Sequence, residues 1–145
     1  MSNQTDDTDR KILEILCYDA RISMTELGKR VHLTSQAVKN RLEKLSDLGI
    51  VEHYTVNVNC PVYGYKVHAI IKINLANQAE KYLSDYLKDS KYNIIHLYQI
   101  TGLQAYIIDG YFIDNEELQK MLQHIGQYGS YEIQLVLKEI SLARQ

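Results

Sequence analysis

The sequence has few of the residues that mark secreted, membrane-spanning or metal-binding proteins. It holds only two cysteines in 145 residues, Cys17 and Cys60, which are far apart and match no metal-ligand spacing. A disulfide framework uses more cysteines, so we expect a reduced, cytoplasmic chain without a metal or a cofactor. No apolar run approaches the ~20 residues of a membrane span, and the polar N-terminus lacks a signal peptide's apolar stretch, so we expect no membrane partner.

The chain also lacks a large excess of either charge. It has 16 lysines and arginines against 18 acidic residues, and the net charge of −2 argues against a polycation that coats nucleic acid indiscriminately. Positive charge is instead local, because residues 27–46 contain five lysines and arginines and one acid, Glu43. Such a patch would bind DNA by neutralising phosphates, with an affinity that falls as salt rises.

Residues 23–49 predict two short helices joined by a tight turn. Ser23 and Glu26 have the S-x-x-E spacing of a capping box, in which each side chain bonds the other's backbone N–H at the start of a helix. Leu27 and Val31 are four residues apart and share one face of this first helix.

The second helix of this pair has an apolar face and a polar, cationic face. Thr34 supplies its N-cap oxygen, and Gly49 stands where a C′ glycine ends a helix. The apolar residues have helical spacing and are Val38, Leu42, Leu45 and Leu48. The opposite face carries Ser35, Gln36, Lys39, Asn40 and Glu43, with Arg41 and Lys44 on the flanks.

The chemistry of this polar face suits the major groove of DNA. Gln and Asn both donate to and accept from the edge of adenine, and Lys and Arg contact guanine or phosphate. The N–H groups that begin a helix suit a phosphate oxygen. We therefore predict DNA contacts from Thr34, Ser35, Gln36, Lys39, Asn40, Arg41 and Lys44. Two alternatives stay open: a solvated helix pair that binds no DNA, and a structural role for Arg41 paired with Glu26 or Asp47.

A third helix is predicted upstream, over Asp6–Tyr18, with an apolar stripe that begins at Ile12. Its first turn carries three aspartates that complement the helix dipole, and a metal site there is the weaker interpretation because no His or Cys spacing supports it. Residues 51–57 alternate enough to predict a short strand after the helices. Three helices and such a strand make a small winged helix-turn-helix domain.

The second half predicts a different architecture. Asn59-Cys60-Pro61 and Tyr63-Gly64 are turn signals, which place a linker near Cys60–Tyr65. The order beyond it is β-α-β-β-α-β, a four-stranded antiparallel sheet with both helices on one face. The expected elements are Lys66–Leu75, Gln78–Lys88, Tyr92–Ile100, Leu103–Ile113, Asn115–Gln127 and Tyr131–Ile140. We therefore predict an α+β protein with a DNA-binding domain (1–50), a linking strand and linker (51–65) and a ferredoxin-like domain (66–145).

This sheet would leave one face without helices. Aliphatic and tyrosine side chains partly line that face, and an exposed apolar face usually has a partner. Dimerisation through the sheet would also supply two recognition helices for two half-sites. The five histidines form no recognisable ligand cluster, and we interpret them as scattered, exposed or half-buried residues.

The chain resembles the Lrp/AsnC family, the leucine-responsive or feast/famine regulators, over nearly its whole length. Four motifs carry the resemblance: D-x-x-I-L-x-x-L from Asp9, D-x-R-x-S from Asp19, E-L-G from Glu26 and R-L-x-x-L-x-x-x-G-I-V from Arg41. A further stretch, ITGLQAYIIDGYFIDNEEL, matches in the second half. The resemblance implies a helix-turn-helix, a linking strand and a ligand-sensing ferredoxin-like domain. It also implies dimers that assemble into tetramers or octamers, and in many members an amino-acid effector.

The chain departs from the family in the loop that the resemblance assigns to sensing. The family pattern is close to G-x-Y-D-Y, whereas this chain has Gly-Leu-Gln-Ala-Tyr over residues 102–106. The residues that would line an effector site are Gly102, Leu103, Ala105 and Tyr106. Because Ala105 replaces the acid that would hold an α-ammonium group, we expect weak or absent binding of leucine and similar amino acids.

Three functions compete at this point. The first is a sequence-specific transcriptional regulator that binds double-stranded DNA as a dimer or larger assembly, with a nucleoid-associated location. The second is an architectural protein that bends or wraps DNA with low sequence preference. The third is an enzyme, since some relatives with this architecture decarboxylate a tetrapyrrole and lack the DNA-binding face. The cationic helix favours DNA binding, and we expect no catalytic residues.

Overall fold

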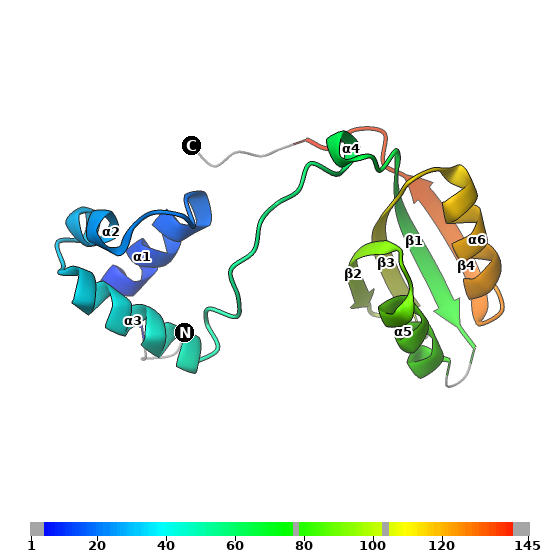
Figure 1. Cartoon of the computed structure of the whole chain (residues 1–145). Helices are drawn as coiled ribbons and strands as arrows, with labels where there is room; N and C mark the ends of the chain where they lie inside the picture. The colour runs from blue at the N-terminus through cyan, green and yellow to red at the C-terminus, as the bar shows by residue number, and fades with distance from the viewer. Residues whose placement is uncertain (1–4, 77–78, 103–104, 141–145) are drawn as a thin grey trace. The chain divides into compact units, whose positions relative to one another are not determined.

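The chain folds into two compact units, one ending at Asn57 and the other beginning at Val58 (Figure 1). The computed structural model describes residues 5–76, 79–102 and 105–140. The division between the units lies inside the predicted linker of residues 51–65.

The first unit consists of α1 (Asp7–Tyr18), α2 (Met24–Val31) and α3 (Ser35–Asp47), which confirms the three predicted helices. Their apolar faces meet in a core formed by Ile12, Ile22, Leu27, Val31, Val38, Leu42 and Leu45. Burial of these side chains, worth about 1.5–3 kcal/mol each for a large aliphatic residue, holds the three helices together. The same packing leaves the opposite face of α3 exposed.

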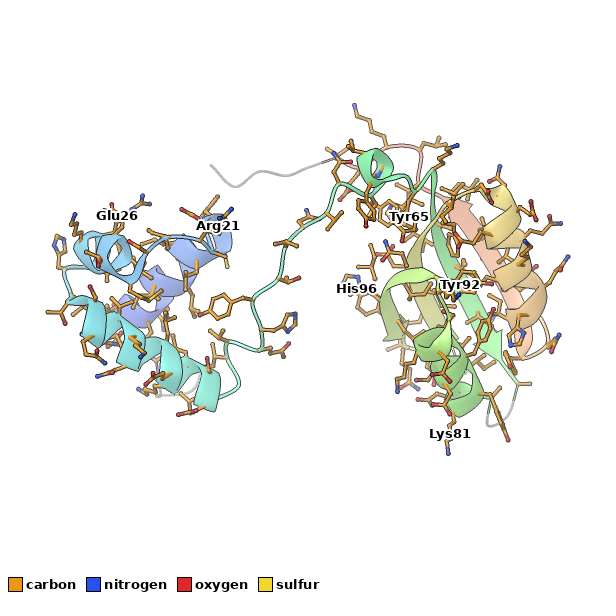
Figure 2. All side chains as sticks on the ribbon, viewed as in Figure 1. Arg21, Glu26, Tyr65, Lys81, Tyr92 and His96 are labelled. Carbon is orange, nitrogen blue, oxygen red and sulfur yellow. The ribbon has the colours of Figure 1, made fainter. Side chains whose placement is uncertain are left out.

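Side-chain caps explain where the helices begin. Asp6 Oδ1 accepts the Asp9 N–H at 2.8 Å and Asp9 Oδ2 accepts the Asp6 N–H at 3.1 Å, so the complete capping box is at α1. Ser23 Oγ accepts the Glu26 N–H at 3.1 Å, whereas the Glu26 carboxylate, labelled in Figure 2, lies 3.6 Å from Arg30 Nε. At α2, Ser23 therefore acts as the predicted cap, whereas the Glu26 side chain forms an ion pair with Arg30.

The predicted C′ glycine ends α3. Gly49 has a φ of +69°, its N–H donates to the Ser46 carbonyl at 2.9 Å, and the Ile50 N–H donates to the Leu45 carbonyl at 2.9 Å. These two bonds are the pair that defines a Schellman motif. The motif satisfies carbonyls that the last turn of the helix leaves open.

The strand predicted over residues 51–57 is wrong. Residues 52–59 lie outside every helix and strand of the structure. A strand requires a hydrogen-bonded neighbour, and the sheet of the described residues consists only of strands from the second unit. The segment keeps its apolar alternation, with Tyr54, Val56 and Val58 exposed to solvent, and Val56 at 79 %.

The second unit begins with a short helix, α4 (Cys60–Tyr63), where only a linker was predicted. The order that follows confirms the βαββαβ prediction. The elements are β1 (Val67–Leu75), α5 (Glu80–Asp89), β2 (Asn93–Gln99), β3 (Ala105–Phe112), α6 (Asn115–Ile125) and β4 (Gly129–Leu135). The last strand ends at Leu135 rather than Ile140, and the predicted ends at Gln78 and Leu103 lie outside the described residues.

The sheet has the order β2-β3-β1-β4, and each neighbouring pair is antiparallel. Helices α5 and α6 lie on one face of it (Figure 1). Alternate residues of β1 and β3 pack beneath them, with Ile71, Ile73 and Ile108 fully buried. The other face carries His68, Ile70, Lys72 and Asn74 of β1, and Ala105, Ile107, Asp109 and Tyr111 of β3. We call these eight residues the open face.

Cys17 and Cys60 are both free cysteines, and both lie in helices. Cys17 lies on α1 and is exposed. Cys60 begins α4 and is buried, with its sulfur 3.6 Å from Asn93 Nδ2. In the part of the chain that the structure describes, no helix is long and apolar enough to cross a membrane.

Candidate nucleic-acid interface

A tight turn sets α3 against α2. His32 ends α2 in the left-handed conformation, with a φ of 56°, and the Leu33 N–H donates to the Gly28 carbonyl at 2.8 Å. A Cβ atom on Gly28 would lie 2.5 Å from the Leu33 carbonyl oxygen. The turn therefore packs directly on the backbone of α2, and only glycine leaves room for it.

Two of the predicted DNA-contacting residues shape the start of α3. Thr34 Oγ1 accepts the Ala37 N–H at 3.1 Å, so this side chain caps the helix. Ser35 Oγ lies 3.1 Å from Thr25 Oγ1, which links the first turns of α2 and α3. Both contacts orient the N-terminal turn of α3, whose backbone N–H groups suit an anion.

The exposed face of α3 carries two side-chain pairs. Gln36 Nε2 donates to Asn40 Oδ1 at 2.8 Å, and Lys39 Nζ lies 3.9 Å from Glu43 Oε1. All four residues are exposed, and each pair joins positions four apart on one face of the helix. An exposed ion pair such as Lys39–Glu43 contributes less than about 1 kcal/mol, so Lys39 exchanges it readily for a contact with a ligand.

Arg41 does not lie with this exposed set. Its Nη1 is 2.7 Å from Asp6 Oδ2 and 2.7 Å from Asp9 Oδ1, and Asp9 is 1 % exposed. The partners named in the structural alternative for Arg41, Glu26 and Asp47, are therefore wrong, because Arg41 forms its ion pairs with Asp6 and Asp9. The contacts span 32 and 35 residues, so they depend on how α3 packs against α1.

These contacts shift two pKa values in a consistent direction. The backbone N–H of Asp9 and then the Arg41 guanidinium hold the pKa of Asp6 below its usual range. The Asp9 and Asp6 carboxylates raise the pKa of Arg41, which stays charged. The acidic first turn of α1 is thus a cap and a partner for Arg41, and the described residues contain no group of three or more His, Cys, Asp and Glu that could hold a metal.

The remaining cations of the motif flank this face. Lys29 Nζ and Arg30 Nε lie 3.8 Å and 3.6 Å from the Glu26 carboxylate, as partly exposed pairs. Lys44 lies in the last turn of α3 and is exposed. We call Lys29, Arg30 and Lys44 the positive rim of the helix pair.

The structure describes three of the four predicted effector residues, and a Cβ atom on Gly102 would lie 3.8 Å from the Cβ atom of Ala105. Gly102 has a φ of +122° in the turn before β3, and Leu103 lies outside the described residues. Ala105 and Tyr106 are 4 % and 5 % exposed and are consecutive in β3, so they point to opposite faces of the sheet. Tyr106 belongs to the core beneath the helices, where a hydrogen bond to Glu80 raises the pKa of its hydroxyl.

One cluster was missed by the sequence reasoning. His68 Nε2 lies 2.7 Å from Asp109 Oδ1. The Nδ1 atom of His96, a residue labelled in Figure 2, lies 3.5 Å from Asp109 Oδ2. The Tyr111 ring stacks on His68 at a centroid distance of 4.0 Å. Two of the five histidines are therefore not scattered. Their strand positions put them on one face, but only the register of β1, β2 and β3 shows that they meet.

Comparison with known proteins agrees with this architecture. A family model for the AsnC-type helix-turn-helix domain matches residues 6–46. A helix-turn-helix-type transcriptional regulator of Pyrococcus horikoshii is 36 % identical over 124 residues, covering 83 % of this chain and 79 % of that protein. The structure of Bacillus subtilis LrpC matches 99 % of this chain and 100 % of its own, with 26 % identity and a TM-score of 0.89.

A second solved structure shows the same fold at greater distance in sequence. It is a transcriptional regulator of Neisseria meningitidis in complex with L-methionine, which matches 97 % of this chain and 94 % of its own, with 24 % identity and a TM-score of 0.85. The motifs, the two-unit architecture and these likenesses agree, and the chain belongs to the Lrp/AsnC family of helix-turn-helix transcriptional regulators.

Proposed function

We propose that the chain is a sequence-specific transcriptional regulator that inserts α3 into the major groove and reads bases with Gln36, Lys39 and Asn40. The observation that supports this most is the division of α3 itself. Val38, Leu42 and Leu45 are buried in the core, while the three proposed readers are exposed on the other side. A recognition helix needs this division, because the same helix must pack on its domain and reach base edges.

Phosphate contacts would come from the ends and flanks of the motif. The first turn of α3, oriented by Thr34 and Ser35, offers backbone N–H groups to a phosphate. Lys29, Arg30 and Lys44 supply the positive rim. We leave Arg41 out of this set, because its Nη1 is engaged by Asp6 and Asp9. A nucleoid-associated location follows from the proposed DNA binding.

Two alternatives differ from this proposal in what they predict for binding. An architectural protein would bind most duplexes with similar affinity, since backbone contacts carry no sequence information. An enzyme on this fold would have no use for an exposed cationic helix. The specificity ratio, which compares a preferred duplex with a scrambled one, separates a regulator from an architectural protein.

We expect the full-length chain to bind a duplex selected from a random library at least ~10³-fold more tightly than a scrambled duplex. Lys39→Ala should weaken binding and lower the slope of log K against log salt by about one, because one positive charge that displaces a counterion from the DNA is lost. Fluorescence anisotropy across a salt series measures both quantities. Lys81→Ala is the matched control, since Lys81 is exposed on α5 in the other unit (Figure 2), and it should change neither. A ratio below tenfold would favour the architectural alternative.

We further propose that the chain works as a dimer or a larger assembly. The open face holds Ile70 and Ile107 without a covering helix, and residues 54–58 expose three apolar side chains. One end of the open face is covered, since the Tyr111 hydroxyl donates to Glu139 at 3.2 Å. The uncovered remainder would be buried by a second copy, which would also bring a second recognition helix to DNA.

An amino-acid effector is the less supported part of the family's behaviour in this chain. The Neisseria meningitidis relative binds L-methionine, but here Ala105 stands where an acid would hold the ammonium, and Tyr106 packs into the core. An ammonium buried without a partner is costly. We propose that any effector of this chain is a less charged molecule, or that the loop serves only as a contact between copies.

Two measurements on the full-length chain test the proposed assembly and the proposed lack of an amino-acid effector. Light scattering of the full-length chain at micromolar concentration should give the mass of a dimer or more, because the open face needs a cover. Calorimetric titration with each standard amino acid should give no binding in the micromolar range, and the mass should not change. A monodisperse monomer would refute the assembly. Micromolar binding of any amino acid, lost in Gly102→Thr, would refute our interpretation of the loop.

A further inference from the structure

The hydrogen bond between Gln36 and Asn40 suggests different roles for these two residues of the proposed DNA-reading face. Both residues lie in the first half of α3, the part of a recognition helix that contacts base edges. Gln36 Nε2 donates to Asn40 Oδ1 at 2.8 Å, and both side chains are exposed. From this contact we infer that Asn40 reads adenine in the major groove and that Gln36 positions its amide. The inference rests on the proposed function and names the base that it selects.

The atoms left available on Asn40 match one base. An amide oxygen has two lone pairs and an amide nitrogen has two hydrogens, and the bond from Gln36 uses one lone pair. The remaining lone pair and an Nδ2–H form an adjacent acceptor and donor. Adenine presents the complementary pair, with a donor at N6 and an acceptor at N7. Guanine presents two acceptors, so Oδ1 would face O6 of guanine without a hydrogen between them.

Gln36 matters because the two ends of an amide differ only in their hydrogen bonding. While Gln36 Nε2 donates toward Asn40, a turned Asn40 amide would place its Nδ2–H groups against that donor. The contact therefore favours the orientation in which Oδ1 stays on the side of Gln36. It also lowers the conformational freedom that Asn40 must lose when it binds a base.

The neighbouring pair on the same face provides an internal control. Lys39 and Glu43 are also four residues apart and exposed, but their contact is a loose 3.9 Å ion pair. Glu43→Gln removes an acid from the face and should strengthen binding to every duplex through weaker repulsion of phosphates. It changes no atom of the Gln36–Asn40 contact, so the preference for adenine should stay as in the unchanged chain.

The test uses the full-length chain and a duplex selected by it from a random library. Each adenine of the duplex is replaced in turn by 7-deaza-adenine, which lacks the N7 acceptor and keeps the pairing edge. We expect one adenine per half-site at which the replacement weakens binding about tenfold. Asn40→Ala should lower the ratio of the two affinities, for the unmodified duplex over the 7-deaza-adenine duplex, to near one. Gln36→Glu should also lower it, because a carboxylate cannot donate to Oδ1 and would accept from Nδ2 instead.

The ratio is insensitive to uniform losses of affinity, such as the repulsion that Gln36→Glu adds. An unchanged ratio in Asn40→Ala would overturn the assignment of the reader, and an unchanged ratio in Gln36→Glu would overturn its positioning. A selected site without any adenine that responds to 7-deaza-adenine would overturn both. Failure of the unchanged chain to prefer any duplex would instead refute the proposed function. Circular dichroism melts should show that both variants fold as the unchanged chain does.

Discussion

Gly28→Ala should destabilise the first unit by about 2–3 kcal/mol and abolish specific DNA binding. The added Cβ would meet the Leu33 carbonyl oxygen at 2.5 Å and the carbonyl carbons of Leu33 and Thr34 at 3.4 Å. These are backbone atoms, so no change of rotamer can relieve the contact. Alanine favours a helix over glycine by about 1 kcal/mol, which is smaller than the expected cost of moving the turn. Urea unfolding of the full-length chain, followed by a binding assay on the selected duplex, measures both effects.

Gly49→Ala is the matched control for this prediction. Gly49 has a φ of +69° but no atom within 4 Å of an added Cβ, so its cost is conformational only, about 1–2 kcal/mol. DNA binding should survive in this variant because the turn between α2 and α3 is untouched. If Gly28→Ala unfolds at the same or a higher urea concentration than the unchanged chain, the close approach at the turn does not limit the fold.

Arg41→Met should destabilise the first unit by about 3 kcal/mol, the lower end of the range for breaking a buried ion pair. Asp9 is 1 % exposed and would lose the guanidinium that lies 2.7 Å from its Oδ1. We expect a cost at the lower end of that range because the Arg41 side chain is 31 % exposed. Lys39→Met removes the same charge from an exposed pair and should cost less than about 1 kcal/mol. Asp9→Asn in the Arg41→Met background should recover part of the loss, because a neutral amide is less costly to bury unpaired.

The dependence on pH gives a second readout of the same ion pair. The pKa of Asp6 is lowered in the folded chain, first by the Asp9 N–H and then by Arg41. Its contribution to stability is therefore full above the unfolded value of about 3.9 and is lost as the pH falls through the lowered folded value. Arg41→Met should weaken this acid dependence. If Arg41→Met keeps its stability and instead lowers the salt slope of DNA binding by about one, Arg41 contacts phosphate and our structural assignment is wrong.

Local patterns in the sequence predict most of the elements, because their causes are local. The oxygens of Ser23 and Thr34 cap the helices that they precede, and Gly49 ends α3 with the expected bonds. The apolar spacing of Val38, Leu42 and Leu45 places these residues in the core and their polar neighbours outside. The face proposed to read DNA was therefore readable from helical periodicity alone.

The failed and missed predictions share one cause. Residues 51–57 alternate like a strand, but alternation does not supply the neighbouring strand that a ladder needs. Ala105 and Tyr106, which the family resemblance assigns to an effector site, are adjacent in sequence, and the pleat of β3 sends their side chains to opposite faces. The resemblance does not contain this information, and the effector site stays a prediction.

The sequence by itself determined the family, the three helices of the first unit, the βαββαβ order of the second and the polar face of α3, since capping, periodicity and motif spacing act within a few residues. Only the tertiary structure decided that Arg41 pairs with Asp6 and Asp9, and that His68 and His96 meet at Asp109. These contacts join residues 13 to 41 positions apart. Their existence depends on helix packing and strand register, and burial of the apolar core as a whole sets both.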